Sequence, residues 1–222
     1  MGAVSNTLYI GVDPGKQGAV AFLLSNRANN KTFAVSLSTP VTVTVTKHPR
    51  AKTKSGKPKV TRKSEYNILA MRDIITEWVA KVNKKQKCRV VFCIERQWAR
   101  PTDSKSNIQR MAEGYASWLT IAKLLGLPIV EISPVSWKPK YVPVGADKKE
   151  SVKICTKLYP MVSLPKVKDS DRAEAVLIAD FVRRRDEQID YPLDGKKRLV
   201  RHDVDKPATR KRKLTFKFIF GR

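Results

Sequence analysis

The sequence predicts an α/β fold of three layers, in which a mixed five-stranded sheet carries helices on both faces. The order of segments indicates it: strand-like runs open the chain, and helical and strand-like segments then alternate to about residue 184. A hydrophobic content of 41% is enough for a packed interior. With 222 residues, we expect one such core together with an insertion or a tail.

Strand-like segments come first, at residues 8–13, 18–24, 33–37 and 41–46. The turn Pro14-Gly15-Lys16-Gln17 joins the first two as a hairpin, and alternating valine and threonine suit the last to a pleated surface. Residues 47–63 follow with eight Lys and Arg and no acidic residue. Because this stretch also contains Pro and Gly, we expect a loop or an extended hairpin there rather than a helix.

Helices and buried strands are predicted to alternate from Ser64 onward. The predicted helices cover residues 64–82, 106–125, 147–159 and 171–184, and the predicted strands cover residues 89–95 and 129–132. The run 89–95 is continuously apolar, as in a central strand that is buried on both faces. This order of elements is typical of a ribonuclease-H-like fold. We expect the domain to span residues 1–190, with a basic hairpin insertion at about 47–63 and a basic tail at 191–222.

The charge of the chain predicts its partner. Forty-five Lys and Arg against 20 Asp and Glu give a net charge of +25, which favours nucleic acid as the partner, with an anionic membrane surface second. No apolar run is long enough to span a membrane, and the strand at residue 8 leaves no room for a signal peptide. The three cysteines form no CxxC pair, so we expect them to be reduced in an intracellular protein of the cytoplasm or nucleoid.

Carboxylates stand where predicted strands end. Asp13 ends the first strand, Glu95 ends the apolar strand 89–95, and Asp169, Asp171 and Glu174 surround the start of the last helix. If the two strands are neighbours, both carboxylates emerge at one edge of the sheet. Oxygen ligands without a nearby His or Cys suit Mg²⁺ or Mn²⁺. Two such ions roughly 4 Å apart would clamp the attacking and leaving oxygens of a phosphodiester.

Three acidic segments resemble the motifs of RuvC-type Holliday-junction resolvases, with the phage and chloroplast branch most similar. They are Ile10-Gly11-Val12-Asp13-Pro14-Gly15, Ile94-Glu95 and Asp171-Arg172-Ala173-Glu174-Ala175. Ser133-Pro134-Val135-Ser136-Trp137-Lys138 and Ala146–Val152 resemble the stretch between the second and third motifs, and Gly114-Tyr115 also has counterparts in that branch. The resemblance covers roughly residues 8–184. It implies a homodimeric, Mg²⁺-dependent endonuclease that nicks two opposing strands of a four-way junction.

The catalytic and metal-binding residues predicted from these motifs are Asp13, Glu95, Asp171 and Glu174. In the third motif Asp169 stays open as an alternative to Asp171, because a spacing of three residues selects Asp171 and a spacing of four would fall on Ser170. Lys138 and Lys148 are candidates for contacting the scissile phosphate. The predicted DNA-binding residues are Lys52, Lys54, Lys57, Lys59, Arg62, Lys63, Arg100 and Lys148. Trp98 lies between Glu95 and Arg100, and either reaches into the junction or caps the core.

Two alternative functions and a dimer interface are also considered. The first alternative is a catalytically inactive relative that binds structured nucleic acid, as in a ribonucleoprotein. The second, an actin-like ATPase, needs two phosphate hairpins and more than about 300 residues of two-domain chain. A homodimer would supply two active sites for symmetric cuts. Helix 106–125 carries more apolar surface than one sheet face needs, so we expect the interface there, at Trp118, Ile121 and Leu125.

Overall fold

A mixed five-stranded sheet forms the centre of the computed structural model, which describes residues 6–56, 58–84, 87–147, 149–165 and 169–192. Its strands run in the order β3-β2-β1-β6-β7. Strands β1, β2 and β3 pair antiparallel, whereas β6 and β7 run parallel to β1. Their bounds are β1 Asn6–Asp13, β2 Ala19–Asn26, β3 Lys31–Ser38, β6 Arg89–Glu95 and β7 Ile129–Ile132.

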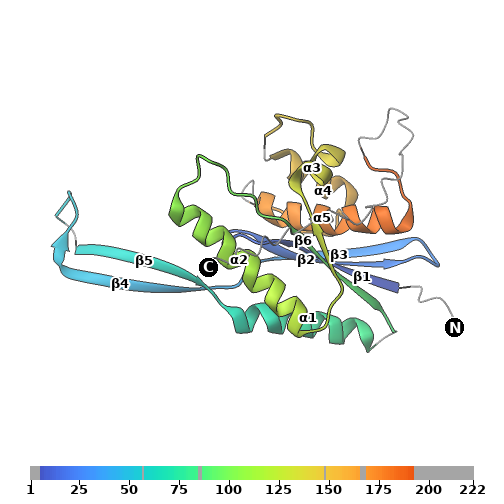
Figure 1. Cartoon of the computed structure of the whole chain (residues 1–222), viewed down its shortest axis with the longest axis horizontal. Helices are drawn as coiled ribbons and strands as arrows, with labels where there is room; N and C mark the ends of the chain where they lie inside the picture. Colours follow the sequence, from blue (N-terminus) through green and yellow to red (C-terminus); the bar gives the residue numbers. More distant parts are fainter. Residues whose placement is uncertain (1–5, 57, 85–86, 148, 166–168, 193–222) are drawn as a thin grey trace, which may run out of the picture.

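Helices cover both faces of this sheet (Figure 1). One face packs against α1 Ile68–Asn83 and α2 Lys105–Leu124, and the other against α3 Pro134–Tyr141, α4 Lys149–Leu158 and α5 Ser170–Glu187. The predicted three-layer α/β fold of ribonuclease-H-like type, with a mixed five-stranded sheet, is confirmed. None of the helices in the described ranges is long and apolar enough to cross a membrane.

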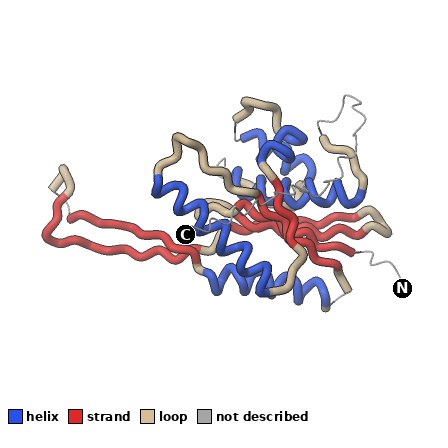
Figure 2. The backbone as a smooth tube through the Cα atoms, in the orientation of Figure 1, coloured by secondary structure: helices blue, strands red, loops and turns tan. Residues whose placement is uncertain are grey.

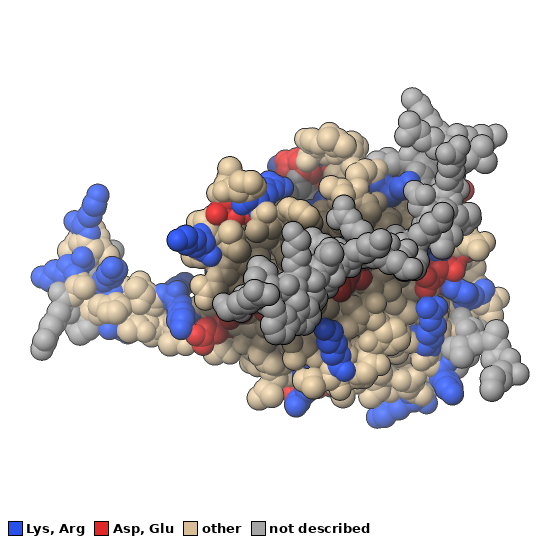
Figure 3. Space-filling model, in the orientation of Figure 1, with Lys and Arg blue, Asp and Glu red and all other residues tan. Residues whose placement is uncertain are grey.

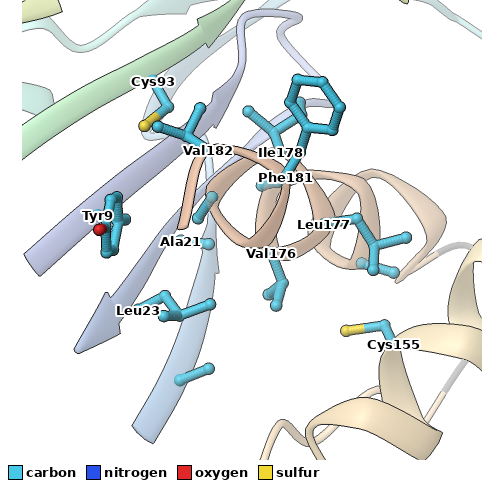
Figure 4. Close-up of a cluster of buried hydrophobic side chains, with 14 of the residues drawn as sticks. Tyr9, Ala21, Leu23, Cys93, Cys155, Val176, Leu177, Ile178, Phe181 and Val182 are labelled. Carbon is cyan, nitrogen blue, oxygen red and sulfur yellow. The ribbon is translucent and has the colours of Figure 1, made fainter. Parts of the chain in front are cut away.

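The alternation of side chains along β1 builds the two halves of the core. Leu8, Ile10 and Val12 pack in the cluster of α1 and α2, whereas Tyr9 packs in the cluster of α5. Figure 4 shows the second cluster, in which α5 lies across the sheet with Val176 and Leu177 among its buried side chains. Both clusters consist of buried, closely packed hydrophobic side chains, so the sheet is a rigid base for the side chains at its edges.

A close contact at Gly11 sets α5 against β1. A Cβ atom at this position would lie 2.1 Å from the carbonyl oxygen of Ala175, so only glycine allows the helix to approach the strand this closely. Because Gly11 lies two residues before the end of β1, the contact brings the first turns of α5 near the carboxyl end of that strand.

A long β-hairpin projects from the body of the molecule (Figures 1 and 2). Strands β4 Val41–Lys52 and β5 Pro58–Tyr66 pair with each other and form their own two-stranded sheet. One expectation is thereby corrected: the helix predicted from Ser64 begins at Ile68. Cross-strand pairing holds residues 64–66 in β5, and the Asn67 side chain caps α1 by accepting from the Ala70 N–H.

The expected interface on α2 is wrong. Trp118 and Ile121 are buried in the monomer against the sheet, and Leu125 packs against the same cluster, so the wide apolar stripe serves the core. Helix α3 was not expected. It has only eight residues and contains Pro139, so it is too short to show a clear helical periodicity in the sequence. The one sequence feature that favours a helix there is Pro134, at the first helical position after Ser133.

Candidate active site

Asp13 and Glu95 end adjacent parallel strands. Val12 pairs with Ile94 in the register of β1 and β6, and the two carboxylates are the next residue of each strand. Because side chains alternate, Asp13 shares the sheet face of Tyr9, and Glu95 shares that of Cys93; both of these residues belong to the α5 cluster. The two carboxylates therefore share an edge of the sheet and also a face.

The electrostatics of Asp13 show that four carboxylates lie near one another. Burial, followed in order of size by the charges of Glu95, Glu174 and Asp171, raises its pKa to about 8. The positive charge of Lys138 acts in the opposite direction. Residues from β1, β6 and the first turns of α5 thus form one acidic cluster, defined here as Asp13, Glu95, Asp171 and Glu174.

Glu95 is held by a neighbour that sequence reasoning missed. The Trp137 indole Nε1–H donates to Glu95 Oε2 at 2.7 Å, and both side chains are buried. Burial raises the pKa of Glu95, while Lys138 and the indole hydrogen bond lower it. Trp137 lies on α3, and no sequence pattern brings that helix against the end of β6; only its position next to Lys138 in the segment that resembles the family pointed to this region.

Lys138 lies inside the acidic cluster. Its Nζ is 3.0 Å from Glu174 Oε2, and the charges of Glu174, Glu95 and Asp13 raise its pKa against the opposing effect of burial, which is the largest. The hydroxyl of Ser151, on α4, donates to Glu174 Oε1 at 3.4 Å. Glu174 is therefore oriented by two side chains, of which sequence reasoning singled out only Lys138.

The two candidates of the third motif have different surroundings. Asp171 acts on Asp13 electrostatically and accepts a hydrogen bond from the Ser170 hydroxyl at 3.2 Å. Asp169 precedes the helix as its N-cap residue and lies 3.6 Å from Arg172 in an ion pair. The structure thus brings Asp171 to the acidic cluster, while Asp169 contacts Arg172.

The donor set of the cluster fits a hard divalent cation. Four carboxylates supply oxygen ligands only, and three of them add to the effect of burial in raising the pKa of Asp13, whereas Lys138 opposes them. Among the described residues, however, no three His, Cys, Asp or Glu side chains are gathered closely enough to hold one metal ion. Lys138 contacts Glu174 instead, so binding of a cation requires the side chains of the cluster to draw together.

The structure has one cleft at the acidic cluster and a second one at the foot of the hairpin. One, of about 370 Å³, is lined by Lys138, Ser151 and Glu174 together with apolar residues of α3 and the segment after it. The other, of about 590 Å³, lies at the foot of the hairpin, where Lys16 and Arg110 line it. The second cleft adjoins the β1–β2 turn that follows Asp13, so it lies between the sheet edge and the hairpin.

Those predicted DNA-binding residues that the structure describes lie mainly on the hairpin. Those in the described residues are exposed: Lys52, Lys54, Lys59, Arg62, Lys63 and Arg100. Figure 3 shows Lys and Arg gathered on the projecting hairpin. Lys57 and Lys148 lie outside the described residues, as does the predicted tail beyond residue 192. Trp98 is 78% exposed, so it does not cap the core.

Comparison with known proteins finds similarity in structure at low sequence identity. No protein-family profile matches the chain, and no curated protein does. Among solved structures, RuvC of Thermus thermophilus is similar at 15% identity and a TM-score of 0.48, over 84% of this chain and 100% of that one. T. thermophilus RuvC in complex with Holliday junction substrate is similar at 14% identity and a TM-score of 0.43, over 80% of this chain and 95% of that one.

Proposed function

We propose that the protein is a metal-dependent endonuclease that resolves four-way DNA junctions by paired cleavage of opposing strands. The observation that carries the proposal is the acidic cluster, in which Asp13, Glu95 and Glu174 come from three separate segments and act on one another at one sheet edge. Clustered carboxylates are costly unless a cation offsets them, and a chain of net charge +25 is suited to a polyanionic substrate.

The cluster residues would hold Mg²⁺ or Mn²⁺, as two ions per site, which would activate water and stabilise charge on the phosphate that is cut. The remaining roles fall to the chain itself. Trp137 fixes the orientation of Glu95 through its indole hydrogen bond, and Ser151 does the same for Glu174. Lys138 offsets the repulsion that four carboxylates would exert on an approaching phosphate.

Selectivity for junctions requires surfaces beyond the cluster. The exposed hairpin lysines would hold a duplex arm, and Trp98 and Arg100, which follow Glu95, extend from the cutting edge toward the branch point. Paired cleavage needs two active sites related by twofold symmetry, so we propose a homodimer whose interface does not include the buried Trp118. Light scattering at micromolar concentration tests this: a monomer that retains full cleavage contradicts it.

A second candidate is a catalytically inactive relative that binds structured nucleic acid. Two observations favour it: Lys138 lies against Glu174, and no three-ligand group is formed among the described side chains. The nuclease is favoured because each of the three motifs keeps its carboxylate and because the charge of Asp171 acts on Asp13.

The deciding experiment uses a synthetic four-way junction labelled on each strand in turn. The nuclease should place symmetric nicks in opposing strands with Mg²⁺ and none with EDTA. Asp13→Asn should abolish the nicks and leave junction binding intact, because loss of a ligand removes chemistry but not phosphate contacts. Binding without cleavage under Mg²⁺ or Mn²⁺ would establish the inactive relative instead.

A further inference from the structure

The hairpin of β4 and β5, here called the arm, has two chemically different faces. In its register Val43 pairs with Ser64, Val45 with Arg62, and Lys47 with Val60, and opposed residues share a face. The first set forms the valine face: Val43, Val45, Lys47, Val60, Arg62 and Ser64. The second set forms the threonine face: Thr42, Thr44, Thr46, His48, Lys59, Thr61, Lys63 and Glu65.

Side-chain contacts across the threonine face agree with this division. His48 Nε2 lies 2.9 Å from Thr61 Oγ1, and Lys63 Nζ lies 2.6 Å from Glu65 Oε1. The polar groups of this face thus find partners on the arm itself or in water. A polar, hydrogen-bonded face is what a solvent-facing side of a strand pair requires.

The exposed valines of the valine face have no partner of this kind on the arm among the described contacts. Val43, Val45 and Val60 are 54%, 52% and 47% exposed, in a row along the ribbon. A two-stranded ribbon is only marginally stable in water, and its apolar face normally packs on another layer. Figures 1 and 2 show this ribbon extending away from the sheet and helices. A row of exposed valines on such a ribbon indicates an interaction surface.

The charges on the valine face select the partner. Lys47 and Arg62 stand among the valines, and the face as defined has no acidic residue. A second copy of the arm would bring identical cations together, which disfavours self-association. Double-stranded DNA offers what both residue types need, because each groove is bordered by phosphates and walled by apolar deoxyribose carbons.

We propose that the valine face of the arm lies along a groove of double-stranded DNA. The valine methyl groups pack against deoxyribose, and Lys47 and Arg62 pair with the bordering phosphates. On β4 the face runs from Val43 to Lys47, about 13 Å at roughly 3.3 Å per residue, which is less than half a turn of duplex. The proposal deepens the proposed function, since the DNA is the duplex arm of the same junction, but it depends on binding alone.

The experiment measures binding of the full-length protein to a 20-base-pair duplex and to a four-way junction in EDTA. The triple variant Val43→Thr, Val45→Thr and Val60→Thr keeps shape, strand propensity and charge. We expect it to bind both DNAs on the order of tenfold more weakly, because apolar contact is lost, with an unchanged dependence on salt. The control Thr42→Ser, Thr44→Ser and Thr61→Ser removes methyl groups from the opposite face and should bind as the wild type does.

A charge variant tests the same face independently. Lys47→Ala with Arg62→Ala should reduce the slope of log affinity against log salt by nearly two, at roughly 0.9 per phosphate contact. The pair Lys59→Ala with Lys63→Ala removes equal charge from the threonine face and should reduce the slope less. Far-ultraviolet circular dichroism and limited proteolysis establish that the arm stays folded in each variant.

Three results would overturn the proposal. These are unchanged affinity in the valine triple variant, an equal or larger slope change in the threonine-face pair, and a valine triple variant that dissociates a dimer in light scattering, which would assign the face to a second copy. Failure of the proposed function is read separately, as absence of Mg²⁺-dependent nicks by the wild type, and leaves these binding comparisons interpretable.

Discussion

Lys138 Nζ lies 3.0 Å from Glu174 Oε2, so the acidic cluster contains a cation supplied by the chain. The same ammonium acts on Glu95 and Asp13, whose carboxylates end the neighbouring strands β6 and β1. It thereby offsets part of the repulsion among carboxylates that come from three segments. A divalent cation bound by the cluster would compete with this ammonium for Glu174.

Replacing Lys138 with Met should expose that competition. We expect Lys138→Met to melt at a lower temperature than the wild type in EDTA, because the carboxylates lose their nearest positive charge. Added Mg²⁺ should then raise its melting temperature by more than it raises that of the wild type. Lys140→Met is the control, since Lys140 lies on the same helix but contacts the Tyr191 ring. Equal Mg²⁺ shifts in all three proteins would contradict the prediction.

The raised pKa of Asp13 predicts a pH dependence of stability. Its pKa is about 8 in the folded protein against an ordinary value of 3.8, so the folded state binds one more proton than the unfolded state between these values. The free energy of unfolding in EDTA should therefore fall as pH rises from about 5 to 8, by up to about 1.4 kcal/mol per pH unit from this group.

Comparison with Asp13→Asn isolates this contribution, because the other titrating groups are common to both proteins. The stability of the variant relative to the wild type should rise across the same pH range and level off above about 8. Urea unfolding at each pH measures it. A difference that is constant with pH would show that Asp13 titrates normally.

Trp137 provides a test of how Glu95 is positioned. Trp137→Phe removes the donor to Glu95 Oε2 and leaves a buried carboxylate short of a partner, which costs about 1.5–3 kcal/mol beyond the loss of packing. Trp118→Phe is the matched control, because Trp118 is as deeply buried but its Nε1 has no hydrogen-bond partner among the described residues. Urea unfolding should show a larger loss for Trp137→Phe. A rescue by Glu95→Gln in the Trp137→Phe background would further assign the loss to the charge.

The sequence predicted the central sheet because its pattern is local. Asp13 and Glu95 end apolar runs, and parallel pairing of those runs follows from the segment order, so their meeting at one edge was expected. The position of Glu174 near the start of the last helix was also expected, because it lies three residues after Asp171 in the sequence. Trp137 and Ser151 were not expected, because their roles depend on how α3 and α4 pack on α5, and residue spacing carries no information about that packing.

The predicted start of the first helix and the predicted interface on α2 were wrong for the same physical reason. In both cases tertiary contacts prevail over the local preference of the residues. Residues 64–66 can start a helix, but Ser64 and Tyr66 pair across the arm with Val43 and Val41. The stripe on α2 reads as an interface because Trp118 is large, but the sheet face of Phe22 and Phe92 is wide enough to bury it. In both cases the sequence specified the apolar residues and left open which surface would cover them.

Asp180 predicts a large effect on stability away from the cluster. Its fully buried carboxylate accepts from Tyr141 and Tyr159 and pairs with Arg183 and Arg184, joining α5 to α3 and to the end of α4. Asp180→Ala removes the acceptor of two buried tyrosine hydroxyls and leaves Arg183 with Glu187 as its remaining carboxylate partner, so it should destabilise the protein by about 3–5 kcal/mol.

The control for Asp180 is Asp186→Ala, on the same helix. Asp186 pairs with Arg89, which is half exposed, so its removal should cost about 1 kcal/mol or less. Because Asp180 fixes α3, which carries Lys138, its variant should also lose nuclease activity at temperatures where it remains folded. Equal losses of stability in the two variants would show that the buried Asp180 network does not contribute more to stability than an exposed ion pair does.

The choice between Asp171 and Asp169 predicts opposite outcomes for two neighbouring substitutions. Asp171→Asn should abolish Mg²⁺-dependent cleavage, because Asp171 belongs to the acidic cluster, and should lower the pKa of Asp13 by removing a like charge. Asp169→Asn should retain cleavage, and the loss of its ion pair with Arg172 should cost about 1 kcal/mol or less. Cleavage of the four-way junction and the pH dependence of unfolding measure the two effects. Loss of cleavage in Asp169→Asn with retention in Asp171→Asn would assign the metal-binding position to Asp169.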